Sequence, residues 1–239
     1  GSKALDKILN GGWASGEVTE LAGEYATGKS QTCYTAIGSV FLPPDEGGLN
    51  SDDDIGVAVI DTENTFTLRR MIPIFKRFNI DPKKTEDKIW VARPKNTYHQ
   101  LKAIERLVQI VKDLNVKLII VDSLTKLPRV DFTGRGQLYD RQRIIISMVE
   151  KLRRLALMYN IIVLVTNQVV AVPDVVYGRK YEPVGGHVLA HNVDTRLLLS
   201  RSSENIRKVR IIDSSWLPPA DTKIAITEAG ITDVKRDSS

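Results

Sequence analysis

Short runs of β-branched and aliphatic residues alternate with longer stretches of helical periodicity up to about residue 166. This alternation is typical of parallel βαβ units, in which each helix packs back onto the sheet. The clearest helix is expected at 138–159, where apolar residues recur every three to four positions. Strands are expected at 18–22, 55–61, 88–92, 117–122 and 161–166, and helices near 29–41, 67–78, 97–114 and 138–159.

Beyond residue 192 the pattern changes to shorter β-like runs that polar turns separate, at 195–200, 209–213 and 223–227. Such runs favour an antiparallel extension of the sheet. Because no internal repeat or low-complexity linker marks a boundary, we expect one α/β domain over 1–239. Its central sheet should be largely parallel and flanked by helices, with the antiparallel strands at the C-terminal end.

Two connections are too long to be plain turns. One runs from Ser123 to about Gln137, and the other from Gln168 to about Gly186. Both leave the carboxyl ends of expected strands, which is the edge where open α/β sheets bind ligands. Loops of this length without structure of their own are usually functional or disordered. The pattern therefore predicts a second binding surface formed by these two connections.

The most specific motif lies between the first expected strand and the first long helix. Residues 23–30 read Gly-Glu-Tyr-Ala-Thr-Gly-Lys-Ser, which is the G-x-x-x-x-G-K-[ST] phosphate loop in its expected setting. Gly23 and Gly28 allow a tight turn whose backbone N–H groups converge on an anion, and the following helix N-terminus adds partial positive charge. Lys29 would reach the β- and γ-phosphates, and the Ser30 hydroxyl would bind Mg²⁺. The motif predicts nucleotide binding.

Composition narrows the class of protein without identifying it. The 239 residues are 42% hydrophobic and 26% charged, with no apolar run near the ~20 residues that span a bilayer, so we expect no membrane partner. The single cysteine, Cys33, excludes an intramolecular disulfide and is expected in the core. A net charge of +5 is compatible with a nucleic-acid partner but does not demonstrate one.

Three polar positions at strand ends are candidates for chemistry. Asp122 ends an apolar strand, where the acidic partner of a phosphate loop would hold Mg²⁺. Glu63 could act as the general base that activates water, although it or Asp61 could equally cap the helix that follows. Gln168 could hydrogen-bond the γ-phosphate or simply satisfy local backbone. Spacing alone leaves both alternatives open.

Eight segments that occur in one order along the chain carry a family resemblance. They are GEYATGKSQ (23–31), LPPDEGGLN (42–50), VIDTENTF (59–66), LIIVDSLT (118–125), GRGQLYDRQ (134–142), VTNQVVA (165–171), VGGHVLAH (184–191) and LPPADTKIAITEAGI (217–231). Together they resemble the RecA/RadA recombinase family, in particular its archaeal RadA and eukaryotic Rad branch. The resemblance covers the ATPase core only. The family's N-terminal helical domain and polymerisation linker would lie upstream of Gly1 and are expected to be absent from this chain.

The resemblance implies a RecA-like P-loop ATPase fold, with ATP and Mg²⁺ as cofactors. It implies that Glu63 activates water, that Gln168 senses the γ-phosphate and that Lys29 completes the catalytic set. It places Arg70 on the adenine and His191 at a subunit interface, and it makes 213–218 a cap over a neighbour's ATP. The implied nucleotide-binding residues are Gly23, Glu24, Tyr25, Ala26, Thr27, Gly28, Lys29, Ser30, Gln31, Arg70, His191, Asp213 and Pro218, with Ser30 and Asp122 on the metal.

The same resemblance assigns the two long connections to DNA. From 126 to 143 the chain carries five basic and two acidic residues, whereas 168–186 is neutral. Contacts in the second connection should therefore rest on backbone N–H groups and apolar wedging. The implied DNA-binding residues are Arg129, Phe132, Arg135 and Arg141 in the first connection and Val170, Val172, Gly185 and Gly186 in the second.

The leading hypothesis is a DNA-dependent ATPase core of a homologous-recombination recombinase that forms filaments on single-stranded DNA and promotes strand exchange. The alternative is a nucleotide-binding paralogue that acts as a mediator, favoured by Ser215 at a usual proline of the cap. A ring helicase or signalling ATPase fits the motifs less well. Expected partners are single- and double-stranded DNA, recombination mediators and, with the upstream linker, further copies of the chain. The compartment would be the cytoplasm and nucleoid in an archaeon, or the nucleus in a eukaryote.

Overall fold

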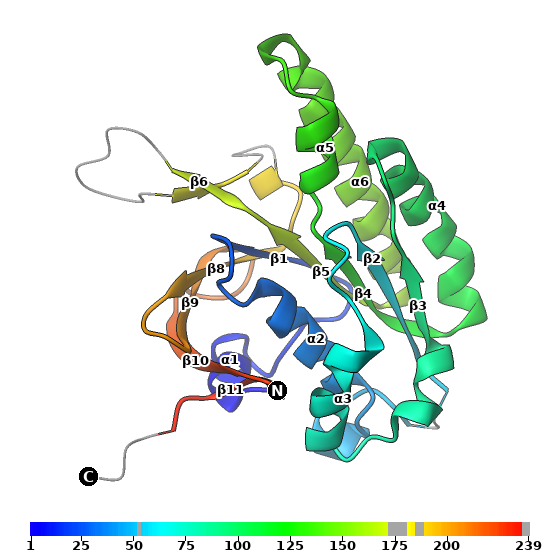
Figure 1. Cartoon of the computed structure of the whole chain (residues 1–239), viewed down its shortest axis with the longest axis vertical. Coiled ribbons are helices and arrows are strands. Elements are labelled where there is room, and N and C mark those ends of the chain that lie inside the picture. Colours follow the sequence, from blue (N-terminus) through cyan, green and yellow to red (C-terminus); the bar gives the residue numbers. More distant parts are fainter. Residues whose placement is uncertain (52–53, 172–180, 185–188, 236–239) are drawn as a thin grey trace.

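The computed structural model describes residues 1–51, 54–171, 181–184 and 189–235. Within them a sheet of nine strands has the order β11-β10-β9-β8-β1-β5-β4-β2-β3 (Figure 1). A separate two-stranded sheet pairs β6 with β7. The strands are β1 (Val18–Gly23), β2 (Gly56–Asp61), β3 (Ile89–Ala92), β4 (Val116–Asp122), β5 (Ile162–Asn167), β6 (Val169–Ala171), β7 (Tyr181–Pro183), β8 (Thr195–Arg201), β9 (Ile206–Ser214), β10 (Asp221–Thr227) and β11 (Gly230–Asp233).

The five strands expected in the parallel part are all present, and their pairing confirms the parallel core. β1 pairs in parallel with β5, β5 with β4, β4 with β2 and β2 with β3. Every residue of β1, β2 and β5 is buried. That burial is why these strands read as continuous apolar runs rather than as alternating ones.

The expected antiparallel extension is also present. β8 joins the sheet by pairing in parallel with β1, and β9, β10 and β11 then add in antiparallel fashion. β11 was not expected from the sequence, because four residues after a glycine turn give too short a pattern.

Helices cover both faces of the sheet (Figure 1). Alternate strand residues face opposite sides, so Val59 and Ile120 pack in one core with α2 and α3, whereas Ile60 and Val121 pack in the other with α4 and α6. Cys33 is buried in the first core, as expected. The helices are α1 (Lys3–Ile8), α2 (Lys29–Val40), α3 (Leu68–Arg77), α4 (Thr97–Asp113), α5 (Lys126–Asp131) and α6 (Leu138–Tyr159).

The two long connections have more regular structure than their sequences suggested. The first contains α5 and a 3₁₀ turn at Arg135–Gln137, and the second contains the hairpin of β6 and β7. The sequence pattern predicted none of these elements in the described part of either connection. α5 is only six residues long and holds Pro128, so it shows no helical periodicity that a sequence pattern could reveal.

The two ends of the described chain lie together at the edge formed by β11. The Ser2 hydroxyl donates to Asp233 Oδ1 at 2.6 Å, and the Ala4 N–H donates to the same oxygen at 2.9 Å. Among the helices that the structure describes, none has the length and apolar character needed to cross a membrane. The carboxyl ends of the parallel strands β1, β2, β4 and β5 meet at one edge of the sheet.

Candidate nucleotide site

The phosphate loop joins β1 to α2 and depends on glycine at two positions. Gly28 caps α2 in the left-handed backbone conformation, with φ at +92°, which residues other than glycine rarely adopt. A Cβ at Gly28 would also overlap the Ile226 side chain of β10. A Cβ at Gly23 would come within 2.5 Å of the Leu199 carbonyl oxygen of β8. The loop is therefore a backbone cradle that neighbouring strands pack against closely.

Lys29 is folded over this loop. Its Nζ donates to the carbonyl oxygens of Gly23 at 2.8 Å and Glu24 at 2.7 Å. Burial lowers the pKa of Lys29, and the nearby carboxylates of Asp122 and Glu63 oppose that change. A partly desolvated ammonium group at a glycine-rich loop is well suited to bind phosphate oxygens.

Asp122, at the end of β4, is nearly fully buried beside the Ser30 hydroxyl. Its Oδ1 accepts from Thr166 Oγ1 at 2.5 Å, it also accepts from Ser30, and its buried Oδ2 has no partner among the described residues. Burial raises the pKa of Asp122; the hydrogen bonds from Ser30 and Thr166 oppose the rise, and the charge of Glu63 adds to it. An orphaned carboxylate oxygen next to a hydroxyl matches the hard oxygen ligands of Mg²⁺.

No cluster of three acidic, histidine or cysteine side chains that could hold a metal occurs in the part of the chain that the structure describes. This is compatible with the Ser30 and Asp122 pair, because Mg²⁺ in phosphate-loop proteins takes most of its ligands from phosphate and water. The residues present therefore fit a magnesium–nucleotide complex better than an all-protein metal site.

The structure separates the two acids that follow β2. Asp61 accepts from the backbone N–H groups of Thr65 at 3.3 Å and Phe66 at 3.0 Å, so it caps the turn. Glu63 instead accepts from Lys126 Nζ at 2.9 Å and from Ser123 Oγ at 3.3 Å, and it lines the cavity above the phosphate loop. Thr67 caps α3. Of the two functions that spacing left open, helix capping is not the one that Glu63 performs here.

Gln168 follows β5 and lines the same cavity. Its Oε1 accepts from Arg129 Nη1 of α5 at 2.8 Å. The side-chain amide therefore does not bond local backbone through this oxygen, which was the competing interpretation from sequence. Instead, Gln168 connects the cavity to the first long connection.

Arg70 lies at the exposed mouth of the cavity, on α3. Its guanidinium carbon lies 5.1 Å from the centre of the Tyr34 ring, and its Nη1 donates to the Thr65 carbonyl at 3.0 Å. A guanidinium plane held in this way offers its other face to a flat base.

The cavity has a volume of about 370 Å³ and brings together most of the residues expected to bind or process nucleotide. Gly23 and Glu24 are not among the lining residues, but their carbonyl oxygens accept hydrogen bonds from Lys29 Nζ. The expected residues that line the cavity are Tyr25, Ala26, Thr27, Gly28, Lys29, Ser30, Gln31, Glu63, Arg70, Asp122 and Gln168. Sequence reasoning missed five further lining residues, namely Thr65, Ser123, Thr166, Arg207 and Ile226.

Two of the missed residues differ in how they could have been found. Thr166 lies in the segment already singled out at the end of β5, so its place at the sheet edge could have been inferred. Arg207 lies on β9, far along the chain, and its Nη2 donates to the Ala26 carbonyl at 3.4 Å. No local signal in the sequence places Arg207 beside the phosphate loop.

Three of the expected nucleotide-binding residues lie elsewhere. His191 is exposed in a turn before β8, Asp213 is exposed on β9 and Pro218 is exposed after it. Pro218 lines a different hollow of about 600 Å³ beside α1. None of the three lines the cavity above the phosphate loop, so within one chain the structure does not bring them to the nucleotide.

The residues expected to bind DNA are only partly described. Arg129 and Phe132 lie on and just after α5, both half-buried, and Arg141 Nη1 donates to the Phe132 carbonyl at 3.5 Å. Val170 is 44% exposed on β6. Arg135 is placed by its backbone in the 3₁₀ turn, and its side chain is not described. Val172, Gly185 and Gly186 lie outside the described residues.

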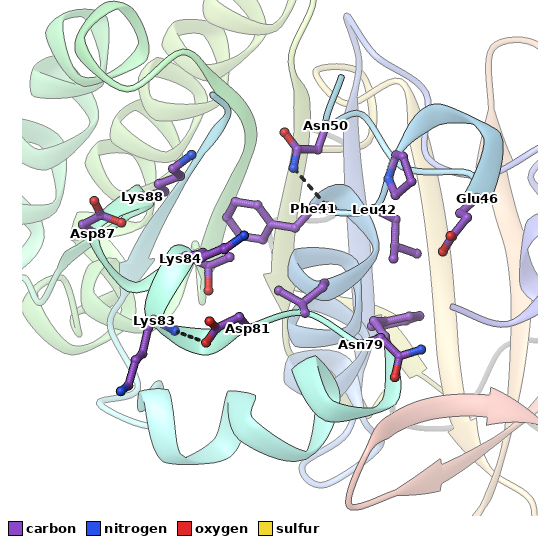
Figure 2. A pocket seen from close by; sticks show the side chains of 14 residues that line it. Phe41, Leu42, Glu46, Asn50, Asn79, Asp81, Lys83, Lys84, Asp87 and Lys88 are labelled. Carbon is purple, nitrogen blue, oxygen red and sulfur yellow. Dashed lines mark hydrogen bonds between the residues drawn. The ribbon is translucent and has the colours of Figure 1, made fainter. Parts of the chain in front are cut away.

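A larger hollow of about 560 Å³ lies between the end of α2 and the segment after α3 (Figure 2). Phe41 and Leu42 point into it, the Asn50 side chain donates to the Phe41 carbonyl at 3.3 Å, and the Lys83 N–H donates to Asp81 at 3.0 Å. Basic and acidic side chains are mixed around this hollow, and none of the residues expected to bind nucleotide is among those that line it. Its size therefore does not make it the better candidate.

Comparisons with known proteins agree with the fold. The family model for Rad51 matches residues 1–234. The DNA repair and recombination protein RadA of Ignicoccus hospitalis is 42% identical over 234 residues, which cover 98% of this chain and 72% of the relative. The protein of the same description from Aeropyrum pernix is 41% identical over the same shares. The chain belongs to the Rad51 family of RecA/RadA recombinases.

Proposed function

We propose that this protein is the ATP-hydrolysing core of a DNA recombinase whose turnover depends on DNA. One observation carries the proposal: a single cavity holds Lys29, Ser30, Glu63, Asp122 and Gln168, which come from the ends of four neighbouring elements. The two RadA relatives, described as DNA repair and recombination proteins, support the choice of recombination over other uses of ATP.

Nucleotide binding is assigned to the phosphate loop and the residues beside it. The backbone of 23–30 and the N-terminus of α2 would hold the phosphates, with Lys29 on the β- and γ-phosphates. Ser30 and Asp122 would hold Mg²⁺, which neutralises the charge that develops on the phosphate oxygens. Arg70 would cover the adenine from the mouth of the cavity.

Hydrolysis is assigned to Glu63 and Gln168. Glu63 lines the cavity with a carboxylate that can accept a proton from an attacking water. Gln168 would donate from its amide to the γ-phosphate and so register its presence. Both groups lie at the same sheet edge as the phosphate loop, which is the arrangement that in-line attack on a γ-phosphate requires.

DNA binding is assigned to the two long connections. The first is basic, with five cationic residues against two acidic ones between 126 and 143, and it offers Phe132 for stacking or packing. The hairpin of the second presents Val170 to solvent. Both begin at the sheet edge that carries the nucleotide cavity, so a strand bound there would lie next to the γ-phosphate machinery.

A neighbouring copy would complete the site. His191, Asp213 and Pro218 are exposed and do not line the cavity of their own chain. In a head-to-tail assembly, the same residues of one copy can face the cavity of the next. Self-association on DNA and recombination mediators are the partners that this arrangement implies.

The decisive experiment measures ATP turnover with and without single-stranded DNA, for the protein and for Glu63→Gln. We expect DNA to raise turnover, and the variant to bind ATP while losing at least about 100-fold of its rate, because a general base contributes on that order. Undiminished hydrolysis in Glu63→Gln would refute the assigned base. Bound ATP without any DNA-stimulated turnover would favour the mediator instead.

A further inference from the structure

The short helix α5 carries two cations that reach the two groups assigned to the γ-phosphate. Lys126 and Arg129 are three residues apart, so their side chains share one face of α5. Lys126 contacts Glu63, which follows β2, and Arg129 contacts Gln168, which follows β5. One short helix therefore connects two residues that follow different strands and lie more than a hundred positions apart in sequence.

The contacts of Lys126 fix the Glu63 carboxylate. Its Nζ donates to Glu63 Oε2 at 2.9 Å and to the Thr62 carbonyl at 3.1 Å, while Ser123 Oγ lies 3.3 Å from Glu63 Oε1. The side chains of Lys126 and Glu63 are 35% and 27% exposed, so the pair is partly shielded from water. A carboxylate has about four lone-pair sites. Two such contacts therefore orient it and still leave room for a water to donate.

The contact of Arg129 orients the Gln168 amide. A guanidinium group only donates, so the atom that faces Arg129 Nη1 at 2.8 Å is the carbonyl oxygen of the amide. The amide NH₂ is then the end that can donate to a phosphate oxygen. Without Arg129, either end of the amide could turn toward the cavity.

α5 is itself anchored at both ends. Thr125, its N-cap residue, donates through Oγ1 to Asn167 Oδ1 at 2.7 Å, and Asp131 accepts from the Thr97 N–H of α4 at 2.7 Å. Two residues of the helix itself, Leu127 and Pro128, are buried. The helix thus holds Lys126 and Arg129 at defined places above the sheet edge.

We propose that Lys126 and Arg129 are positioning residues for ATP hydrolysis, which rests on the function proposed above. Lys126 holds the base Glu63, and Arg129 holds the amide of Gln168 with its donor end available to the γ-phosphate. Because α5 opens the basic connection assigned to DNA, a strand bound there would contact the helix that holds both groups. The position of this helix therefore links DNA contact to turnover.

The first test replaces Lys126 with Met, which keeps the length of the side chain and removes its charge. We expect kcat with saturating single-stranded DNA to fall about 10-fold, because the base loses a contact that orients it. The KM for ATP should stay within about two-fold, and Lys126→Arg should recover part of the rate. The matched control is Lys102→Met on α4, whose exposed lysine pairs with Glu105 and does not line the cavity.

The second test measures binding alone, so it does not depend on turnover. In Arg129→Met we expect the ratio of ATP to ADP affinity to fall several-fold while ADP affinity is unchanged, because only ATP has the γ-phosphate that Gln168 contacts. Arg129→Lys, which retains a donor, should preserve part of the ratio. Thermal melting of each variant shows whether it is folded.

The outcomes separate this inference from the proposed function. If the unmodified protein shows no DNA-stimulated turnover, the proposed function fails, and the positioning of Glu63 by Lys126 fails with it. If turnover is normal but Lys126→Met changes KM and not kcat, or matches Lys102→Met, Lys126 does not position the base. An unchanged ATP-to-ADP ratio in folded Arg129→Met would overturn the assignment of Arg129.

Discussion

Gly28 has two independent requirements placed on it, and they can be separated by experiment. Its backbone adopts φ +92°, and the space where a Cβ would project is filled by Ile226 of β10. The first requirement is a property of the loop alone, and the second comes from a strand nearly two hundred residues later. Gly47 also has a positive φ, +82°, but nothing lies within 4 Å of the place where its Cβ would project.

We therefore predict different outcomes for Gly28→Ala and Gly47→Ala. Each should lose about 1 kcal/mol of unfolding free energy from the left-handed backbone. Gly28→Ala should lose more, because Ile226 must move, and its affinity for ATP should also fall. Denaturant unfolding and ATP titration of both variants check this. Equal losses of stability with unchanged ATP affinity would contradict the packing of β10 on the loop.

We predict that Asp122, buried at the proposed metal site, lowers the free energy of unfolding as pH rises. Its folded-state pKa is raised by burial, so the native state holds the proton more tightly than the unfolded state does. The stabilisation from this bound proton is fully present below the unfolded-state pKa, near 3.8, and is lost as pH rises through the raised folded-state pKa of Asp122. Asp122→Asn should therefore gain stability over the unmodified protein between pH 4 and pH 7.

The measurement is denaturant unfolding at both pH values, with the exposed Asp87→Asn as the control. The same Asp122→Asn variant should lose magnesium-dependent ATP binding. If the stability difference between Asp122→Asn and the unmodified protein is the same at pH 4 and pH 7, the burial effect on Asp122 is wrong.

Individual site residues differ in how far sequence could predict them. The phosphate loop was predictable in full because its residues are consecutive, and Asp122 because it ends an apolar strand. Spacing predicted Glu63 only as one of two candidate acids, and the family resemblance selected it; in the structure Glu63 lines the cavity, whereas Asp61 caps the turn. Lys126 itself had no signal beyond its charge, because its importance depends on a neighbour from another strand.

At the scale of elements, β1 is held at the centre of the sheet by a buried polar network as well as by apolar packing. Glu20 of β1 is fully buried and pairs with Arg196 directly opposite on β8. Asn167 at the end of β5 donates to Glu20 at 2.6 Å and accepts from Thr125 at the start of α5. This network joins β1, β5, β8 and the start of α5.

We predict that Arg196→Met destabilises the protein by about 3–5 kcal/mol, because it leaves the Glu20 carboxylate buried without its cation. Arg153→Met removes a cation whose pair with Asp194 is much more exposed, with the arginine side chain 45% accessible. That variant should lose at most about 1 kcal/mol. Urea unfolding of the two variants compares them, and similar losses would show that the buried pair has no special weight.

The sequence predicted the elements that show a clear apolar run or a helical period. The buried strands and the helix at 138–159 match the structure to within two residues, because burial forces apolar runs and helical periods on them. α1 and α5 were missed because six residues make fewer than two helical turns, and β6 and β7 because three residues are too few to show a strand pattern. Elements of this length are set by tertiary contacts, such as the Thr97 N–H that meets Asp131, rather than by local pattern.

At the scale of the whole molecule, the proposed site is divided between two faces. The cavity carries Glu63, whereas His191 and Asp213 are exposed elsewhere on the same chain. In a head-to-tail assembly each active interface then needs one cavity and one such face, supplied by different copies. A defect in the cavity and a defect in the face would fall in different copies.

We predict that two inactive variants restore activity when mixed. Glu63→Gln has a defective cavity and an intact His191 face, and His191→Ala has the reverse. At equal amounts with DNA, about a quarter of the interfaces would combine the intact cavity with the intact face. Turnover of the mixture above the sum of the separate variants supports the shared site. A strictly additive mixture would show that each chain works alone.

The hydrogen bonds that join Ser2 and Ala4 to Asp233 place the first helix directly against the last strand. The first residues and the last described strand are therefore neighbours, although Ser2 and Asp233 are 231 positions apart in sequence. A short linker could join them, and new ends could be opened in the exposed turn near Gly47. Such a circular permutant should keep the nucleotide cavity while presenting its ends on a different side of the molecule, which offers a way to attach probes.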